Sequence, residues 1–193
     1  MTFTVYVPRD AGALSLGAGD VAHAIAREAT ARGLELQLIR NGSRGAYWLE
    51  PLVEVATAHG RMAYGPVSVG DVPGLFDADF ASGGAHRLSL GLTDAIPWLA
   101  SQQRLTFARV GVVDPASVAD YVIHGGYQGL RRALAMSPEA VVETIIGSGL
   151  RGRGGAAFPT GIKWKTVLEQ PSGQKYVTCN ADEATRARFP TGC

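Results

Sequence analysis

The amino-acid sequence predicts an α/β protein in which a small N-terminal domain precedes the first part of a second α/β domain. The first observation is a strand-helix-strand pattern over residues 3–40, followed by a hairpin pattern. The second is a run of five glycines in residues 147–155, between two helical patterns. Hydrophobic residues make up 46% of the chain and charged residues 18%, which is typical of a globular protein with a packed core.

The first 40 residues have the periodicity of a β-α-β unit. Phe3–Val7 is a short run rich in β-branched and aromatic residues, which predicts a strand. Asp20 can cap a helix that continues to about Arg32, and Gly33 ends it. Leu34–Arg40 alternates apolar and polar residues, as a half-buried strand does.

A hairpin and a helix are expected next. Leu52–Thr57 and Arg61–Tyr64 flank the turn sequence Ala58-His59-Gly60, and Asp71–Phe76 can form a last helix. A strand-helix-strand unit followed by a hairpin and a helix is the layout of a thioredoxin-like domain. We therefore expect such a domain over residues 1–78.

The middle of the chain is less regular. The breakers Ser82-Gly83-Gly84 and Pro97 favour a linker over residues 79–104. Leu105–Val113 is a strand candidate, and two short helices are expected over residues 117–124 and 127–135. Ser137-Pro138-Glu139 then begins a third helix, with Pro in its first turn.

The glycine-rich loop carries the clearest chemical signal. Its glycines leave the backbone free to approach a ligand, and Pro159 precedes a helix expected over Thr160–Glu169. Arg151, Arg153 and Lys163 add cationic donors suited to a phosphate. A strand expected over Lys175–Cys179 would then deliver the polar side chains that follow it.

Other interpretations of this loop remain open on spacing alone. Gly152, Gly154 and Ala157 fit the Rossmann fingerprint superficially, but the loop follows a helical pattern instead of a strand. The Walker A pattern fails because no Gly-Lys-Ser/Thr closes the loop. The loop therefore binds an anion or nucleotide, or it is an arginine-rich structural loop.

Composition excludes several classes of function. The net charge of +1 offers no argument for a nucleic-acid partner. No apolar run approaches the roughly 20 residues that direct membrane insertion needs, and the N-terminus lacks a signal-peptide pattern, so we expect a cytoplasmic protein. No metal site is expected, because the cysteines are only Cys179 and Cys193 and the four histidines are scattered.

The segment Gly149–Trp164, followed by Cys179-Asn-Ala-Asp-Glu183, closely resembles the NADH-binding flavoprotein subunit of respiratory complex I and its relatives. Those relatives include subunits of NAD-reducing hydrogenases and the β subunits of NAD-dependent, molybdenum-containing formate dehydrogenases. Gly111–Pro115 and the stretch up to Tyr127 are also similar to this family. The resemblance covers residues 105–183, within an expected second domain of residues 105–193.

The resemblance implies a site for FMN, with NAD(H) stacked against the flavin and hydride passing between them. No side chain of this chain is assigned a catalytic role. The implied cofactor-binding residues are Gly152, Arg153, Gly154 and Lys163 at the FMN phosphate, Asn180, Asp182 and Glu183 at the ribityl chain and flavin ring, and Gly155, Ala156 and Phe158 toward NADH. Ala157 stands where the family usually has glycine, and its methyl group is expected to crowd the dinucleotide.

The N-terminal domain resembles the thioredoxin-like [2Fe–2S] module that accompanies this flavoprotein. That module has two cysteines four positions apart before a Pro-Leu-Val-Glu-Val segment, and the matching residues here are Ser43 and Tyr47. We therefore expect a docking module without a cluster. This fusion is most similar to a formate dehydrogenase β subunit, whose partners would be other subunits of a formate dehydrogenase or NADH dehydrogenase complex.

The C-terminus departs from the family. After Glu183 the family continues Gly-Asp-Ser-Gly-Thr-Phe-x-Asp-Arg-Met, whereas this chain has Ala184-Thr-Arg-Ala-Arg-Phe-Pro-Thr-Gly-Cys193. Removal of one G from a coding string for the family ending reproduces all ten residues and a stop codon. We therefore expect residues 184–193 to be out of frame and the chain to be an inactive N-terminal fragment that retains FMN weakly or not at all and tends to aggregate. The ligands of the family's [4Fe–4S] cluster are absent from it.

Two other functions stay open beside the flavoprotein subunit. The runner-up is a non-catalytic docking module, in which the thioredoxin-like domain folds alone and binds partner subunits. A phosphate-binding regulatory protein is the third, since a fold by itself does not fix a function. Flavin titration separates the first two, because only the flavoprotein subunit predicts FMN binding.

Overall fold

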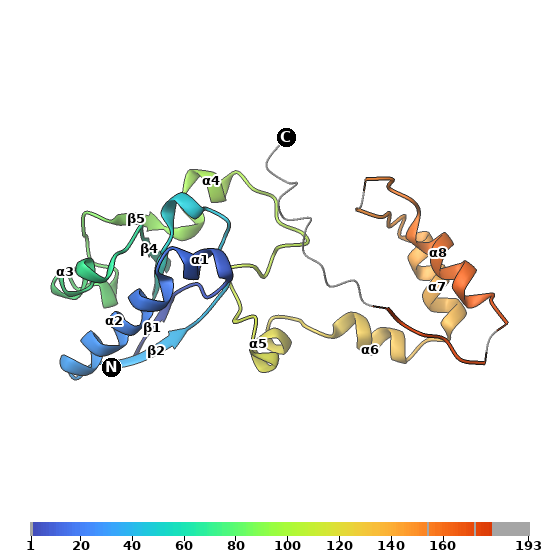
Figure 1. Ribbon diagram of the computed structural model, residues 1–193, viewed down its shortest axis with the longest axis horizontal. Coiled ribbons are helices and arrows are strands. Elements are labelled where there is room, and N and C mark those ends of the chain that lie inside the picture. Colours follow the sequence, from blue (N-terminus) through green and yellow to red (C-terminus); the bar gives the residue numbers. More distant parts are fainter. Residues whose placement is uncertain (1, 154, 172, 179–193) are drawn as a thin grey trace. The chain divides into compact units, whose positions relative to one another are not determined.

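A computed structural model describes residues 2–153, 155–171 and 173–178, and the chain divides into two units, residues 1–127 and 128–193. The N-terminal unit is built on a five-stranded mixed sheet (Figure 1). Its strands are β1 (Thr2–Tyr6), β2 (Glu35–Ile39), β3 (Val53–Thr57), β4 (Gly60–Tyr64) and β5 (Ser89–Leu92). The helices of this unit are α1 (Ala11–Ser15), α2 (Ala18–Ala31), α3 (Val72–Asp77), α4 (Pro97–Ala100) and α5 (Val118–Ile123).

The strand order confirms the thioredoxin-like prediction. The strands lie in the order β2-β1-β3-β4-β5, with β1 parallel to β2 and the remaining neighbours antiparallel. Helix α2 makes the crossover between β1 and β2, as a parallel pair requires. The hairpin β3-β4 pairs Thr57 with Gly60, which confirms the turn expected at Ala58-His59-Gly60.

The main core lies between α2, α3 and the sheet. Ala18, Val21, Ile25 and Ala29 recur at helical spacing on α2 and are all buried, so this apolar face packs on the sheet. Phe3 on β1 meets the rings of Phe76 and Phe80 edge to face, at centroid distances of 6.2 and 5.9 Å. This aromatic cluster fixes α3 against the sheet.

Helix α2 begins earlier than the sequence predicts. Its N-cap is Gly17, with a φ of 93°, and Asp20 lies in the first turn without capping the helix. A separate helix, α1, precedes it and is capped by Asp10, whose side chain accepts the N–H groups of Gly12 and Ala13. The carboxylate of Asp20 still suits the positive end of the helix dipole.

Residues 79–104 contain the strand β5 and the helix α4, so the prediction that this segment is irregular is wrong. Strand β5 pairs with β4, and α4 follows it. Ile96 and Leu99 are buried against Leu52 and Ala63 in a second small core. These contacts attach the segment to the sheet. Because residues 1–78 are thus not the whole of the sheet, the domain boundaries given by the sequence stay predictions.

Two further strand predictions are also wrong. Residues 105–113 form consecutive turns and make no strand. The N–H of Val110 donates to the carbonyl of Phe107, and the N–H of Val112 donates to the carbonyl of Arg109. Residues 175–178 have no strand either, and Cys179 lies outside the described residues. A strand requires a neighbouring strand to satisfy its backbone groups, and neither segment has one within the described ranges.

The second unit is helical where it is described. Its helices are α6 (Gln128–Leu134), α7 (Pro138–Gly147) and α8 (Thr160–Leu168) (Figure 1). The side chain of Ser137 caps α7 by accepting the N–H of Ala140, as the Ser-Pro-Glu sequence predicts. Within the described part of the chain, no helix is long and apolar enough to cross a membrane.

Candidate phosphate-binding loop

The glycine-rich segment forms a closed loop between α7 and α8. Arg151 and Pro159 face each other in an antiparallel bridge, and the N–H of Gly152 donates to the carbonyl of Phe158 at 2.9 Å. The N–H of Thr160 donates to the carbonyl of Leu150, also at 2.9 Å. Residues 151–159 therefore close at their base and project from the start of α8.

Glycine at 161 allows α8 to lie against α7 directly behind this loop. Gly161 is buried, and a Cβ atom there would stand 2.5 Å from Cγ1 and 2.8 Å from the backbone N of Ile146. No other residue type can approach the α7 backbone so closely. The crossing fixes where the first turn of α8 lies relative to the loop.

The first turn of α8 has the donors of an anion site. Its N-cap residue is Pro159, which gives no side-chain cap to the N–H groups of the helix. Such N–H groups carry partial positive charge and bind phosphate readily. Lys163 lies one turn further on, exposed, with its Nζ 5.7 Å from the centre of the Phe158 ring.

The two arginines of the loop bond to the loop itself. Arg151 Nε donates to the carbonyl of Ala157 at 2.6 Å, and Arg153 Nη1 donates to the carbonyl of Arg151 at 2.6 Å. Each guanidinium has further N–H groups that can bind a ligand. The bond of Arg151 is what we expect if this arginine stabilises the loop itself. The spacing of residues in the sequence did not reveal the directions of the two arginine side chains.

Ala157 has a backbone conformation that explains why glycine suits this position. Its φ is 48°, in the left-handed region, where a residue with a Cβ atom is destabilised by roughly 1–2 kcal/mol. The neighbouring Gly155, with a φ of 103°, has no such penalty. The departure from the family's glycine therefore strains the backbone of this chain, an effect separate from the expected crowding of a ligand.

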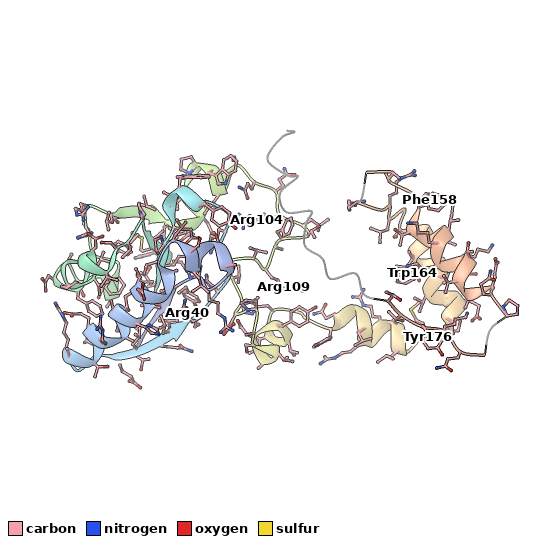
Figure 2. All side chains as sticks on the ribbon, viewed as in Figure 1. Arg40, Arg104, Arg109, Phe158, Trp164 and Tyr176 are labelled. Atoms are coloured by element: carbon pink, nitrogen blue, oxygen red, sulfur yellow. The ribbon has the colours of Figure 1, made fainter. Side chains whose placement is uncertain are left out.

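Only part of the predicted site can be placed. Gly152, Arg153, Gly155, Ala156 and Phe158 lie together on the loop, and Lys163 lies on α8 beside it. Phe158 is 45% exposed; Figure 2 shows it at the end of the loop, with Trp164 on α8. Gly154, Asn180, Asp182 and Glu183, like residues 184–193, lie outside the described residues.

A residue outside the predicted site orders the end of α8. Lys175 Nζ donates to the carbonyls of Val167 and Leu168 at 2.7 and 3.3 Å and so satisfies the C-terminal end of the helix. The sequence signal is a lysine shortly after a helix end, which also favours this helix dipole.

A cleft of about 390 Å³ lies between α7 and α8, but it is not the anion site. Its lining includes the carboxylates of Glu139, Glu143 and Glu169, and it contains none of the predicted cofactor residues. Those carboxylates would repel a phosphate. The loop and the first turn of α8 remain the part of this unit whose donors fit one.

The positions of the expected cluster cysteines in the N-terminal unit are occupied by hydroxyl residues. Ser43 is buried, and its backbone N–H donates to Asp10 Oδ2 at 2.6 Å, whereas Tyr47 lies half-exposed in a short 3-10 helix. An iron–sulfur cluster is held by thiolates, so these residues do not fit one. Among the described residues, no group of three or more His, Cys, Asp or Glu side chains could hold a metal ion.

Comparison with known families places the loop in a flavin-binding context. Residues 145–187 match the family model described as the Nuo51 FMN-binding domain. The chain is 51% identical over 82 residues to the HndC component of the NADP-reducing hydrogenase of Solidesulfovibrio fructosivorans, covering 42% of this chain and 17% of that protein. It is also 51% identical over 73 residues to a component of the NADH-quinone oxidoreductase of Aquifex aeolicus, covering 38% of this chain and 17% of that protein.

Among solved structures, the N-terminal part of the chain is similar to the thioredoxin-like [2Fe–2S] ferredoxin from Aquifex aeolicus. The TM-score is 0.40 at 20% identity, covering 47% of this chain and 97% of the ferredoxin. The assignment of the fold rests on the strand order β2-β1-β3-β4-β5.

Proposed function

We propose, for a chain that belongs to the NADH-binding flavoprotein family, that its loop 151–159 binds the phosphate of FMN as part of an oxidoreductase subunit that uses NAD(H). The observation that carries the proposal is the closed glycine loop at the first turn of α8, which has no side-chain cap, within the segment that matches the family. The chain spans 17% of the hydrogenase and the quinone oxidoreductase components that it resembles, so the activity of a whole subunit is part of the proposal.

Each described residue then has a defined task. Gly152 lets the backbone come close to the phosphate, while Arg153 and Lys163 supply charged donors beside it. Gly155 and Ala156 form the exposed tip of the loop, where a dinucleotide could lie, and Phe158 offers a ring for stacking. Gly154, Asn180, Asp182 and Glu183 are proposed to complete the site from outside the described residues.

The chain's own contribution is binding and orientation. Bound FMN would supply the chemistry, accepting hydride from NADH and releasing electrons one at a time to iron–sulfur clusters. The loop fixes one end of the cofactor, so that its reactive ring lies in a defined place relative to a dinucleotide. The ligands of the [4Fe–4S] cluster expected in the family are not among the residues of this chain.

A formate dehydrogenase is our proposal for the parent complex. It is supported by the fusion of a thioredoxin-like domain with Ser43 and Tyr47 at the cluster positions to the start of a flavoprotein domain. The relatives found belong to hydrogenases and NADH-quinone oxidoreductases. A neighbouring gene for a molybdenum-containing formate dehydrogenase α subunit would support the proposal, whereas neighbouring quinone-reductase genes would contradict it.

The phosphate contact can be tested by comparing two flavins. We expect the Lys163→Gln variant of the 193-residue chain to bind FMN about tenfold more weakly, because one charge-assisted hydrogen bond is lost. Its affinity for riboflavin, which lacks the phosphate, should stay unchanged. Flavin fluorescence during titration measures both dissociation constants.

Lys165→Gln is the matched control for this experiment. Lys165 lies on the same helix, but its Nζ is 3.7 Å from Glu169 and turned toward the end of α8. This variant should bind both flavins as the unmodified chain does. Equal loss of FMN and riboflavin affinity in Lys163→Gln would contradict a phosphate contact.

Absence of any FMN binding by the unmodified chain would instead favour the second candidate function, a thioredoxin-like docking module. That alternative is supported by the N-terminal unit, which contains its own buried core.

A further inference from the structure

The segment that leaves the thioredoxin-like sheet is bound back onto it. Residues 104–113, here called the strap, follow α4 as consecutive turns and lie within the N-terminal unit. Figure 2 labels Arg104 and Arg109 on this segment. Leu105 is 92% exposed and Phe107 63%, so apolar burial of these two side chains does not hold the strap in place.

Side chains from β4 and from the loop after β2 donate hydrogen bonds to the strap backbone. Asn41 Nδ2 and Arg61 Nη1 both donate to the carbonyl of Gly111 at 2.7 Å. Arg61 Nη2 donates to the next carbonyl, that of Val112, at 3.0 Å. Asn41 is fully buried. The carbonyls of Gly111 and Val112 therefore accept hydrogen bonds from a buried amide and from a planar guanidinium.

The guanidinium of Arg61 also contacts side chains of the sheet. The guanidinium of Arg61 lies 3.4 Å from the centre of the Tyr6 ring and 3.5 Å from Glu54 Oε2. Glu54 is buried and also receives two hydrogen bonds from Arg44, at 2.8 and 3.0 Å. These contacts help to orient the Arg61 guanidinium toward the strap.

The strap position also requires glycine. Gly111 has a φ of 79°, and a Cβ atom there would overlap the aliphatic stem of Arg44. The strap lies so close that the backbone carbonyl of Arg44 accepts a hydrogen bond from Arg104 Nη2 at 2.9 Å. The positive φ, the close approach of Arg44 and the two hydrogen bonds to the Gly111 carbonyl all favour glycine at position 111.

The strap binds beside the loop in which the [2Fe–2S] module would carry its first two cysteines. Asn41 and Arg44 flank Ser43 in that loop. Both residues are engaged by the strap, Asn41 through its side chain and Arg44 through its carbonyl and stem.

We propose that Asn41, Arg44 and Arg61 form a peptide-binding site that the chain fills with its own Gly111 and Val112. The site takes an exposed pair of backbone carbonyls preceded by a tight turn. Occupied in this way, it holds the strap against the thioredoxin-like sheet. This inference goes beyond the proposed function and stands whether or not the chain binds FMN.

Limited trypsin digestion tests the proposal, because the strap itself contains Arg104 and Arg109. In Gly111→Ala, cleavage after these two residues should be about tenfold faster than in the unmodified chain, since loss of the charge-assisted contacts makes local opening easier. Cleavage after the exposed Arg87 should not change. Mass spectrometry of the early fragments measures each site separately.

Gly91→Ala is the matched control. Gly91 has the same φ of 79°, but nothing lies within 4 Å of a Cβ atom there, so the substitution strains the backbone without displacing a neighbour. Cleavage within the strap should remain at the unmodified rate in this variant. Similar strap cleavage in Gly91→Ala and Gly111→Ala would overturn the proposal.

Arg61→Lys provides a second test that does not depend on backbone strain. Lysine keeps the positive charge beside Glu54 but cannot donate to two carbonyls in the fixed geometry of a guanidinium. Trypsin should therefore cleave the strap faster in Arg61→Lys than in the unmodified chain, while cleavage after Arg87 should stay unchanged. If strap cleavage in Arg61→Lys equals that of the unmodified chain, the site does not hold the strap.

Discussion

At the scale of single residues, Glu50 is an unusual buried carboxyl group. Its Oε2 accepts the N–H of Leu52 at 2.8 Å, but its Oε1 has no hydrogen-bond partner among the described residues. Burial raises the pKa of Glu50 above its ordinary value, and the carboxylates of Asp10 and Glu54 act in the same direction. At a pH between the ordinary and the raised pKa, the folded chain therefore binds more protons at Glu50 than the unfolded chain does.

The sign of the pH dependence follows from this difference. Between the ordinary pKa of a glutamate and the raised value, the folded state binds more protons, so the free energy of unfolding falls as pH rises. We expect Glu50→Gln to lose this fall. At pH 7 the variant should be more stable than the unmodified chain by on the order of 1 kcal/mol, because glutamine has no carboxyl group whose raised pKa lowers the free energy of unfolding as the pH rises.

Urea unfolding followed by circular dichroism at pH 4 and pH 7 measures the effect. Glu35→Gln is the control, since Glu35 is exposed on β2 and its substitution should leave the pH dependence unchanged. An identical pH slope in Glu50→Gln and the unmodified chain would contradict the prediction.

At the scale of secondary-structure elements, the crossing of α7 and α8 depends on Gly161. Alanine is the better helix former by about 1 kcal/mol, but at this position its methyl group would meet the backbone of Ile146 at 2.8 Å. Overpacking of this kind costs typically about 1–3 kcal/mol, so the clash should win. Gly161→Ala should therefore separate α8 from α7 and lower the thermal midpoint of the helical signal.

Gly129→Ala in α6 is the matched substitution, because nothing lies within 4 Å of a Cβ atom there. It should raise helical stability slightly, as propensity alone predicts. A Gly161→Ala chain as stable as the Gly129→Ala chain would show that the close crossing is dispensable.

Local sequence signals predicted the helices well and the strands less well. Ser137 caps α7 as expected, and Ser117 caps α5 at the start of the helix expected over residues 117–124. Such signals are reliable because a cap and the helix it begins are adjacent in sequence. Strands depend on distant partners. Residues 105–113 have a strand-like composition, yet β4 pairs instead with β5, whose residues 89–92 lie among turn residues.

The sequence predicted the glycine loop and the helix that follows it, but not the directions of the loop's side chains. The glycine spacing identified the loop and the start of α8. It could not show that Arg151 and Arg153 donate to the loop's own carbonyls, or that Ala157 takes a positive φ. Those features depend on how the loop closes, which the Arg151–Pro159 bridge decides.

At the scale of the whole molecule, burial is unequal between the two units. The main core consists entirely of residues from the first 80 positions. In the described part of residues 128–178, only Val142 and Gly161 are buried, while Leu134 and Val167 are 78% and 57% exposed. Few buried apolar contacts mean a low free energy of local opening.

Hydrogen exchange should reveal this inequality. We expect the amides of β1 and β3 to exchange more than about 100-fold more slowly than those of α7 and α8. FMN, if the proposed site binds it, should slow exchange in the first turn of α8 and leave β3 unchanged. Protection of α8 equal to that of β3 in the free chain would contradict the prediction.

The bond between Arg61 and Gly111 also bears on how such domains are inherited. A gene fusion that joined the thioredoxin-like sheet to a new sequence just after α4 would leave Asn41 and Arg61 without their carbonyl acceptors. Recombination at that point would therefore yield a weakened domain. A boundary that keeps these hydrogen bonds has to follow Val112, within the sequence that resembles the flavoprotein.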